Sequence, residues 1–173
     1  MRKTDLAAQQ LLTAARIDAA PVDVFALAKL AGADVVQHQF DEDGDISGML
    51  YRDEARTVIG VNSAHSLTRQ RFTVAHELGH LKLHPGRPLI LDASARVNFR
   101  DPTASLATDR EEIEANAFAA ALLMPERLVL DTVGRLLTAS QHTPEKLALL
   151  LAEEFQVSEA AMSYRLINLG ITT

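Results

Sequence analysis

The sequence predicts an α+β fold in which helices dominate, built as one domain over residues 1–173. The chain is 173 residues long, the length of one ordinary domain, and 47% of its residues are hydrophobic, enough to fill one core. Short β-branched runs are confined to residues 34–61, whereas apolar residues at helical spacing occupy most of the remainder. The chain contains no repeat and no linker long enough to separate two domains.

The first half of the chain alternates between helical and extended patterns. Helical spacing predicts packing helices at Asp5–Arg16 and Val22–Leu30. Three extended runs follow, and we expect them to form a small β-meander: Asp34–Phe40, Ser47–Tyr51 and Thr57–Val61. The acidic stretch Asp41–Asp45 lacks the glycine and glutamate positions of a calcium loop, so we interpret it as a solvated hairpin turn.

Helical periodicity returns in the second half. The predicted helices are Ser66–Leu83, Arg110–Leu123, Glu126–Leu137, Pro144–Phe155 and Glu159–Leu169. Ser66 or Thr68 is expected to cap the first of these.

The composition excludes several classes of function. The chain has no cysteine, which rules out disulfides, thiol nucleophiles and cysteine-bound metals, so any metal must be held by histidines and carboxylates. The formal net charge of −6 disfavours broad attraction to nucleic acid or to anionic membranes. Because no apolar stretch has the length of a membrane span and the N-terminus does not resemble a signal peptide, we expect a cytoplasmic protein without membrane contact.

The most informative segment is His76-Glu-Leu-Gly-His80, which lies inside the helix predicted over 66–83. Residues four apart on a helix share one side, so His76 and His80 can bind one metal ion. Glu77 lies about 100° further round the helix, where it can reach a water molecule beside the metal and act as a general base. The alternative is that both histidines merely line an amphipathic helix. Gly79 favours the metal site, because it lowers helix propensity by about 1 kcal/mol and so suggests close packing there.

A catalytic zinc ion needs a third protein ligand. A continuing helix would place His84 about 12 Å along the axis from His76, too far to share its ion, so we interpret it as a helix-end residue. The predicted helix 110–123 offers Glu111, Glu112 and Glu114. Thr108 and Glu111 match a capping box, which would give Glu111 a structural role at the helix start.

Of the two remaining carboxylates we prefer Glu112 as the ligand. It shares a helix face with Asn116, whose amide could orient a neighbouring ligand. Glu114 lies about 200° from it around the axis. The competing interpretation for each acid is a solvated carboxylate near the helix start.

Four stretches together give the chain a specific resemblance to the ImmA/IrrE family of metallopeptidases, strongest over Val22–Leu128. They are Ser47-Gly-Met-Leu50, Ile59-Gly-Val-Asn62, Arg69-Gln-Arg-Phe-Thr-Val-Ala-His-Glu-Leu-Gly-His80 and Glu112-Ile-Glu-Ala-Asn-Ala-Phe-Ala-Ala-Ala-Leu-Leu-Met-Pro125.

The resemblance implies a zincin-like metallo-endopeptidase with a catalytic core at about residues 22–128 and C-terminal helices at 126–169. It implies that His76, His80 and Glu112 bind the metal, in agreement with the helix-face argument. It further implies a bacterial or phage setting and a substrate that is a transcriptional repressor, the only partner expected.

The expected chemistry is peptide hydrolysis, with zinc activating a water molecule and Glu77 as general base. Mn²⁺ or Fe²⁺ also suits two histidines and a carboxylate. The donor that stabilises the oxyanion stays open among four candidates: Tyr51, His65, Arg71 and Tyr164.

The C-terminal stretch supports a rival interpretation. Residues 147–169 have the spacing of a helix-turn-helix, with Ser158 capping the second helix, which suggests a DNA-binding or protein-binding regulator. From Thr143 to Thr173 two basic residues stand against four acidic ones, a balance of 2 − 4 = −2. Since phosphate contacts need the opposite sign, packing against the core or docking of a partner is favoured over DNA binding.

Overall fold

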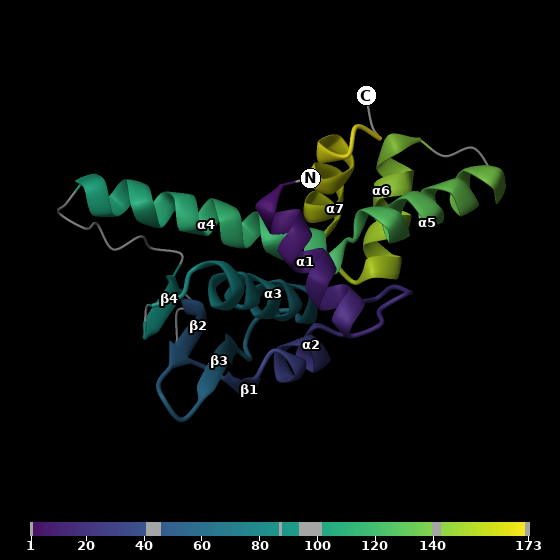
Figure 1. Cartoon of the computed structure of the whole chain (residues 1–173). Coiled ribbons are helices and arrows are strands. Elements are labelled where there is room, and N and C mark those ends of the chain that lie inside the picture. The colour runs from purple at the N-terminus through teal and green to yellow at the C-terminus, as the bar shows by residue number, and fades with distance from the viewer. Residues whose placement is uncertain (1, 41–45, 87, 94–101, 140–142, 172–173) are drawn as a thin grey trace.

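The fold is helix-dominated α+β, as the sequence predicts (Figure 1). The structure is a computed structural model, and it describes residues 2–40, 46–86, 88–93, 102–139 and 143–171. The helices are α1 Lys3–Ala14, α2 Val24–Leu30, α3 Leu67–Leu83, α4 Pro102–Leu123, α5 Glu126–Ala139, α6 Pro144–Phe155 and α7 Glu159–Asn168. The strands are β1 Ala33–His38, β2 Ile46–Arg52, β3 Thr57–Asn62 and β4 Leu89–Ala93. The expected hairpin turn at Asp41–Asp45 lies outside the described residues.

The four strands form one sheet in the order β1-β3-β2-β4. The expected simple meander is therefore wrong in its connections, because β1 pairs with β3 in parallel and only the β2–β3 and β2–β4 pairs are antiparallel. The fourth strand, β4, was not predicted at all. This order leaves β1 and β4 as the edges of the sheet and places β2 and β3 inside it.

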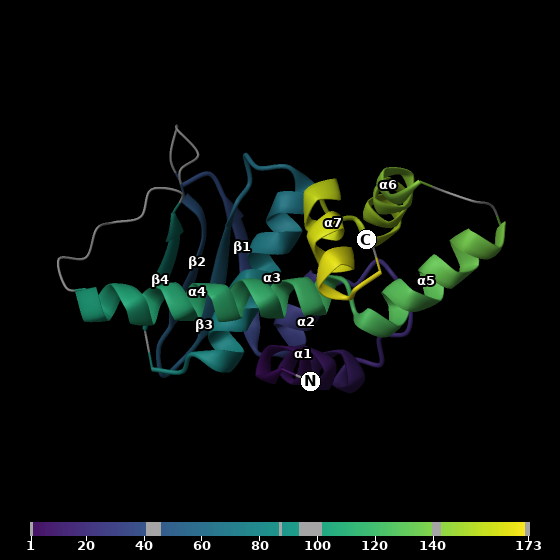
Figure 2. The ribbon, with the colours of Figure 1, turned by 90° about the horizontal axis from the view of Figure 1, so that it is seen from above.

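Helix α3 lies against one face of the sheet, and the long helix α4 crosses α3 (Figure 2). Ser66 caps α3, with its hydroxyl accepting a hydrogen bond from the backbone N–H of Arg69 at 3.4 Å. Helix α4 begins at Pro102 rather than at Arg110. The predicted capping box at Thr108 and Glu111 is consequently wrong: both residues lie within the helix, so Glu111 does not mark its start.

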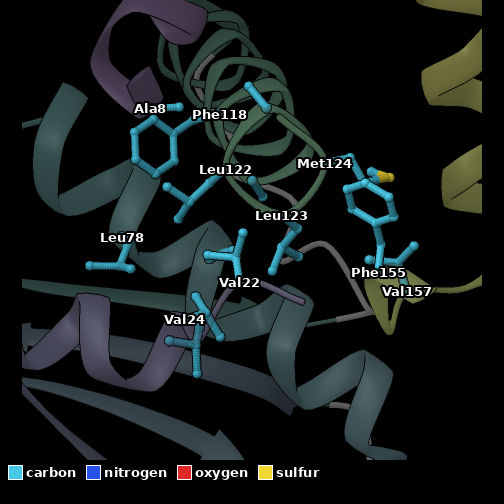
Figure 3. Close-up of a cluster of buried hydrophobic side chains, with 14 of the residues drawn as sticks. Ala8, Val22, Val24, Leu78, Phe118, Leu122, Leu123, Met124, Phe155 and Val157 are labelled. Atoms are coloured by element: carbon cyan, nitrogen blue, oxygen red, sulfur yellow. The ribbon is translucent and has the colours of Figure 1, made fainter. Parts of the chain in front are cut away.

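The hydrophobic core lies where α3, α4 and the C-terminal helices meet. Figure 3 shows Leu78 of α3, Phe118 and Leu122 of α4, and Phe155 at the end of α6 in this cluster, all fully buried. Burying a side chain of this size contributes roughly 1.5–3 kcal/mol. The core therefore fixes α3 and α4, the two helices with the predicted site residues, relative to each other.

Two buried arginines join the C-terminal helices to this core. Arg71 of α3 donates hydrogen bonds to the carbonyls of Val22, Phe155 and Gln156 at 2.9, 3.4 and 3.2 Å. Arg165 of α7 donates to the carbonyl of Met124 at 3.0 Å. Burial lowers the pKa of both guanidinium groups. Helices α6 and α7 are thus packed on the core rather than free.

None of the helices in the described ranges is both long and apolar enough to cross a bilayer.

Helices α3 and α4 approach each other closely at Gly79. A Cβ atom at this position would lie 2.9 Å from the Cα and 3.1 Å from the carbonyl oxygen of Ala115. Backbone atoms cannot give way as a flexible side chain can, so only glycine permits this crossing. The close packing inferred from Gly79 is confirmed.

We predict that Gly79→Ala destabilises the protein by about 1–3 kcal/mol, because the overpacking outweighs the gain of about 1 kcal/mol in helix propensity. Gly134→Ala in α5 is the matched control, since its added Cβ meets no atom within 4 Å. The control should stabilise the protein by up to about 1 kcal/mol. Urea unfolding measures both variants, and equal effects of the two would contradict the crossing.

Candidate metal centre

The predicted histidine pair faces one point beside α3. The Nε2 atoms of His76 and His80 lie 3.0 Å apart, and their ring centroids are 4.7 Å apart. Both residues are buried, with exposed fractions of 3% and 1%. The four-residue spacing on a regular helix accounts for this placement.

Helix α4 brings Glu112 to the same point. Its Oε2 lies 3.1 Å from Nε2 of His76, and its Oε1 lies 3.3 Å from Nε2 of His80. The side chain of Glu112 is 31% exposed, so the solvent side of the triad is the Glu112 side. The structure thus brings together the three residues expected to bind a metal.

These three donors suit a divalent cation. In a tetrahedral site with zinc–nitrogen bonds of about 2.0–2.1 Å, neighbouring ligand atoms are separated by roughly 3.3 Å. The observed separations of 3.0–3.3 Å among the donors of His76, His80 and Glu112 are close to this value. Two unprotonated Nε2 atoms this close repel each other unless a cation or a proton lies between them. The donor set consequently fits a metal ion.

Asn116, one helical turn after Glu112 on α4, contacts the ring nitrogen of His76 that faces away from Glu112. Its side-chain oxygen lies 3.0 Å from Nδ1 of His76. Because this oxygen can only accept, Nδ1 of His76 carries the proton and Nε2 is left bare towards Glu112. The orienting role expected of Asn116 agrees with this contact.

The other two acidic candidates on α4 take different positions. Oε2 of Glu114 lies 3.2 Å from Nε2 of His84 and away from the triad. His84 is the C-terminal cap of α3, as expected for a helix-end residue. Glu114 and His84 therefore stand outside the metal-binding set.

Glu77 is fully buried between α3 and β2. Neither of its carboxylate oxygens has a hydrogen-bond partner among the described residues. Gly48 of β2 packs directly on this side chain, because a Cβ atom at Gly48 would lie 3.3 Å from Oε1 of Glu77. A buried carboxylate without partners is costly unless a proton or a cation is close.

The pKa of Glu77 is raised to about 8, chiefly by burial; His76 opposes this rise, whereas the neighbouring Asp92 and Glu112 add to it. A general base with a pKa near neutrality is well matched to proton transfer. The pKa of Glu112, by contrast, is strongly lowered: burial alone would raise it, but in the metal-free protein hydrogen bonds and charge from His76 and His80, when these rings are protonated, outweigh that effect. Burial opposes protonation of His76, yet Glu112 and the nearby carboxylates raise its pKa overall.

Asp92 is a site residue that the sequence analysis missed. Its carboxylate comes from β4, and together with His76 and Glu77 it forms a second group of atoms that all lie within 4.8 Å of one another. The strand is only five residues long, which is too short to give a clear strand pattern. Its alternation was the available signal, since Ile90 is buried whereas Leu89 and Leu91 are exposed.

Three of the four candidate oxyanion donors have other partners or face solvent. Tyr51 donates to Asp53 at 2.8 Å, Arg71 binds backbone carbonyls beside α6, and Tyr164 is 71% exposed on α7. His65 lies in the turn before α3, one residue before the Ser66 cap.

We predict that Glu112→Gln loses the metal while Glu126→Gln, an exposed change at the start of α5, keeps it. Removing one of three donors leaves two histidines, which are too few for a stable site. After zinc loading and gel filtration, elemental analysis should find about one zinc per chain in the control and near zero in Glu112→Gln. Equal zinc content in the two variants would remove Glu112 from the ligand set.

A second prediction concerns the metal-free protein. The pKa of Glu77 in the folded state, about 8, exceeds its ordinary value of 4.5. Between these values the folded state holds a proton that the unfolded state has lost, so stability falls as the pH rises from about 5 to 8. Glu77→Gln should remove this loss and stabilise the metal-free protein by at most about 3 kcal/mol at pH 7. Denaturant unfolding at pH 5 and pH 8 measures the effect.

The exposed turn residue Glu54 provides the control for this experiment. Glu54→Gln should leave the pH dependence of the unfolding free energy unchanged. A Glu77→Gln variant whose stability follows the wild-type pH dependence would show that the buried carboxyl does not titrate in this range.

Comparison with known proteins gives consistent results. A peptidase family model described as the IrrE N-terminal-like domain matches residues 28–167. The chain is 32% identical over 120 residues to the radiation response metalloprotease IrrE of Deinococcus radiodurans, a match that covers 66% of this chain and 32% of that protein. It is 33% identical over 85 residues to uncharacterized immunity region protein 2 of Bacillus phage phi105, covering 49% of each.

A solved structure of a Mycobacterium tuberculosis transcriptional regulator resembles the fold with a TM-score of 0.61 at 18% identity. That match covers 96% of this chain and 46% of the other. The chain thus spans between a third and a half of the length of these relatives. The family model covers most of the sequence, includes the His76–His80 motif and Glu112, and agrees with the resemblance seen in the sequence, so this chain belongs to the ImmA/IrrE family, whose model is the IrrE N-terminal-like domain.

Proposed function

We propose that this protein is a zinc-dependent endopeptidase that cleaves one specific regulatory protein, with Glu77 as its general base. The observation that supports this most directly is the convergence of His76, His80 and Glu112, with donor separations of 3.0–3.3 Å, beside a buried carboxylate. The same donors accept Mn²⁺ or Fe²⁺, and zinc is proposed because two imidazoles and a carboxylate suit it best among abundant metals.

A zinc ion held by these residues would lower the pKa of a coordinated water towards about 7 and polarise the scissile carbonyl. Glu77 takes a proton from the attacking water on a carboxylate oxygen and returns it to the nitrogen of the leaving amine. Burial of this carboxylate favours its holding the proton between the two transfers. The packing of Gly48 against Glu77 fixes the position of the base.

The substrate is proposed to bind as an added strand along β4. The runs predicted at 47–51 and 57–61 correspond to β2 and β3, which are both internal to the sheet and cannot accept an added strand. Among the described residues β4 has a strand on one side only, and its Asp92 lies beside His76 and Glu77. Backbone hydrogen bonds to this edge would hold an extended segment near the triad.

We propose a helix-turn-helix transcriptional repressor as the substrate and the cytoplasm as the site of action. The names of the relatives, a radiation response metalloprotease and a phage immunity region protein, support a regulatory setting. A protease without restricted specificity would also damage the cell that makes it. Residues 1–173 are proposed to act as one catalytic domain, with its core at 22–128.

DNA binding by α6 and α7 is the second candidate, and the structure disfavours it. The two helices do form a helix-turn-helix, with Gln156 in the left-handed region and Ser158 capping α7. However, one of the two cations in this segment, Arg165, is buried and bound to the carbonyl of Met124. Lys146 is then the one exposed cation of the segment in the described part of the chain, which is too little for phosphate anchoring.

The test compares wild type and Glu77→Gln, both loaded with zinc, on the repressor encoded beside this chain and on casein. Wild type should cut the repressor at one site and leave casein intact. Glu77→Gln should keep its zinc and lose cleavage by about 10²-fold or more, because the base is gone while the ligands remain. Intact-mass spectrometry identifies the cut.

Glu54→Gln is the control and should cleave like wild type. Rapid digestion of casein would contradict narrow specificity. Absence of cleavage of both proteins, together with tight and salt-dependent binding of the chain to operator DNA, would favour the DNA-binding alternative.

A further inference from the structure

A chain of hydrogen bonds leads from the metal-binding face of α3 to the surface of α4. Nδ1 of His80 lies 3.1 Å from Nδ1 of His84, and Nε2 of His84 lies 3.2 Å from Oε2 of Glu114. Oε1 of Glu114 accepts a hydrogen bond from Nε of Arg110 at 3.0 Å. His84 is buried, with 8% of its surface exposed.

The carboxylate of Glu114, at one end of this series of hydrogen bonds, determines where the protons of His84 and His80 lie. A carboxylate can only accept, so Nε2 of His84 donates to Glu114 and Nδ1 of neutral His84 is bare. Nδ1 of His84 must then accept from Nδ1 of His80, at 3.1 Å. Two bare nitrogens would repel each other at this distance, and, unlike the Nε2 atoms of His76 and His80, this pair belongs to no group of donors among the described residues that could hold a cation between them. Neutral His80 in this tautomer has its lone pair on Nε2, the atom that faces Glu112 at 3.3 Å.

The two metal-facing histidines are thus oriented by different partners. Asn116 fixes the tautomer of His76 directly with an amide oxygen, at 3.0 Å. His80 has an imidazole as its partner, and that imidazole is itself oriented by the carboxylate of Glu114. A carboxylate behind a ligating histidine increases the basicity of the ring as well as holding its orientation.

We propose that His84 and Glu114 are positioning residues that hold His80 in the tautomer and orientation required for metal binding. This inference rests on the proposed metal centre of His76, His80 and Glu112. It assigns a role in metal affinity to two residues that the helix geometry excludes as ligands.

A purely structural role as a helix cap does not account for these contacts. The cap of α3 is made by the backbone, with the N–H of His84 donating to the carbonyl of His80 at 3.0 Å. The carbonyl of His84 accepts from Arg52 at 2.7 Å, which holds the backbone from the other side. The imidazole is therefore free of any capping duty, and both of its nitrogens are used in the chain from His80 to Glu114.

The experiment measures zinc affinity by competition with a chromophoric chelator, without any peptide substrate. His84→Leu keeps a side chain of comparable bulk and removes both nitrogens. Its zinc affinity should fall by about 10- to 100-fold. His84→Asn places an amide oxygen near the position of Nδ1, so it can still accept from His80, and it should bind zinc more tightly than His84→Leu does. Glu114→Gln should weaken binding by a smaller factor than His84→Leu, since the charge alone is lost.

Arg127→Gln is the matched control for Glu114→Gln. It breaks the exposed i,i+4 ion pair between Arg127 and Asp131 on α5, at 3.1 Å, whereas Glu114→Gln changes the i,i+4 pair between Arg110 and Glu114 on α4. The zinc affinity of Arg127→Gln should equal that of wild type. Cobalt(II) loading adds a spectroscopic readout: the visible absorption bands of the His84→Leu protein should shift or weaken, because the position of His80 around the metal changes, whereas those of Arg127→Gln should not.

Wild-type affinity in His84→Leu would overturn the proposal, and so would equal affinities in His84→Asn and His84→Leu. If His84→Leu fails to fold, the comparison of Glu114→Gln with Arg127→Gln decides, and equal affinities there would overturn it. Failure of the proposed metal centre is distinguishable, because wild type would then bind no more zinc than Glu112→Gln.

Discussion

The contact between Gly79 of α3 and the backbone of Ala115 in α4 is the constraint on which the site depends. Both helices have regular geometry, so the distance between their axes at this crossing decides how far side chains one turn away can reach. Glu112 and Asn116 lie on the same side of α4 as Ala115 and meet His76 at 3.1 and 3.0 Å. A larger residue at position 79 would separate the helices and draw these contacts apart.

The sheet and the C-terminal helices pack around α3 and α4 and form the surroundings of the candidate metal centre. The sheet covers one side of α3, and Gly48 of β2 packs against Glu77. The carboxylate of Glu77 is therefore buried away from solvent, where its ionised form is costly in free energy. Hydrogen bonds from Arg71 and Arg165 to backbone carbonyls hold the C-terminal helices against the core. Both guanidinium groups therefore have a role in packing. Among the three residues of the triad in the described structure, Glu112 is the one whose side chain reaches solvent.

Much of this was predictable because helix geometry is local. The spacing of His76 and His80 and the face shared by Glu112 and Asn116 follow from 3.6 residues per turn. The packing role of Gly79 follows from its low helix propensity. Strand pairing is not local, and so the parallel β1–β3 pair was missed. Strand β4 with Asp92 was missed because five residues give too short an alternation. The capping box at Thr108 failed because a good local signal was overridden by a helix that continues back to Pro102. The contact of His84 with Glu114 depends on the crossing of two helices, which no single stretch of sequence encodes.

The central claim is that one metal ion is bound by His76, His80 and Glu112, and anomalous X-ray diffraction at the zinc edge tests it most directly. Crystals of the zinc-loaded protein should show one strong anomalous peak, about 2.0–2.2 Å from Nε2 of His76, Nε2 of His80 and a carboxylate oxygen of Glu112. A strong peak between His84 and Glu114 or between Glu77 and Asp92, or no peak beside α3 at saturating zinc, would contradict the account.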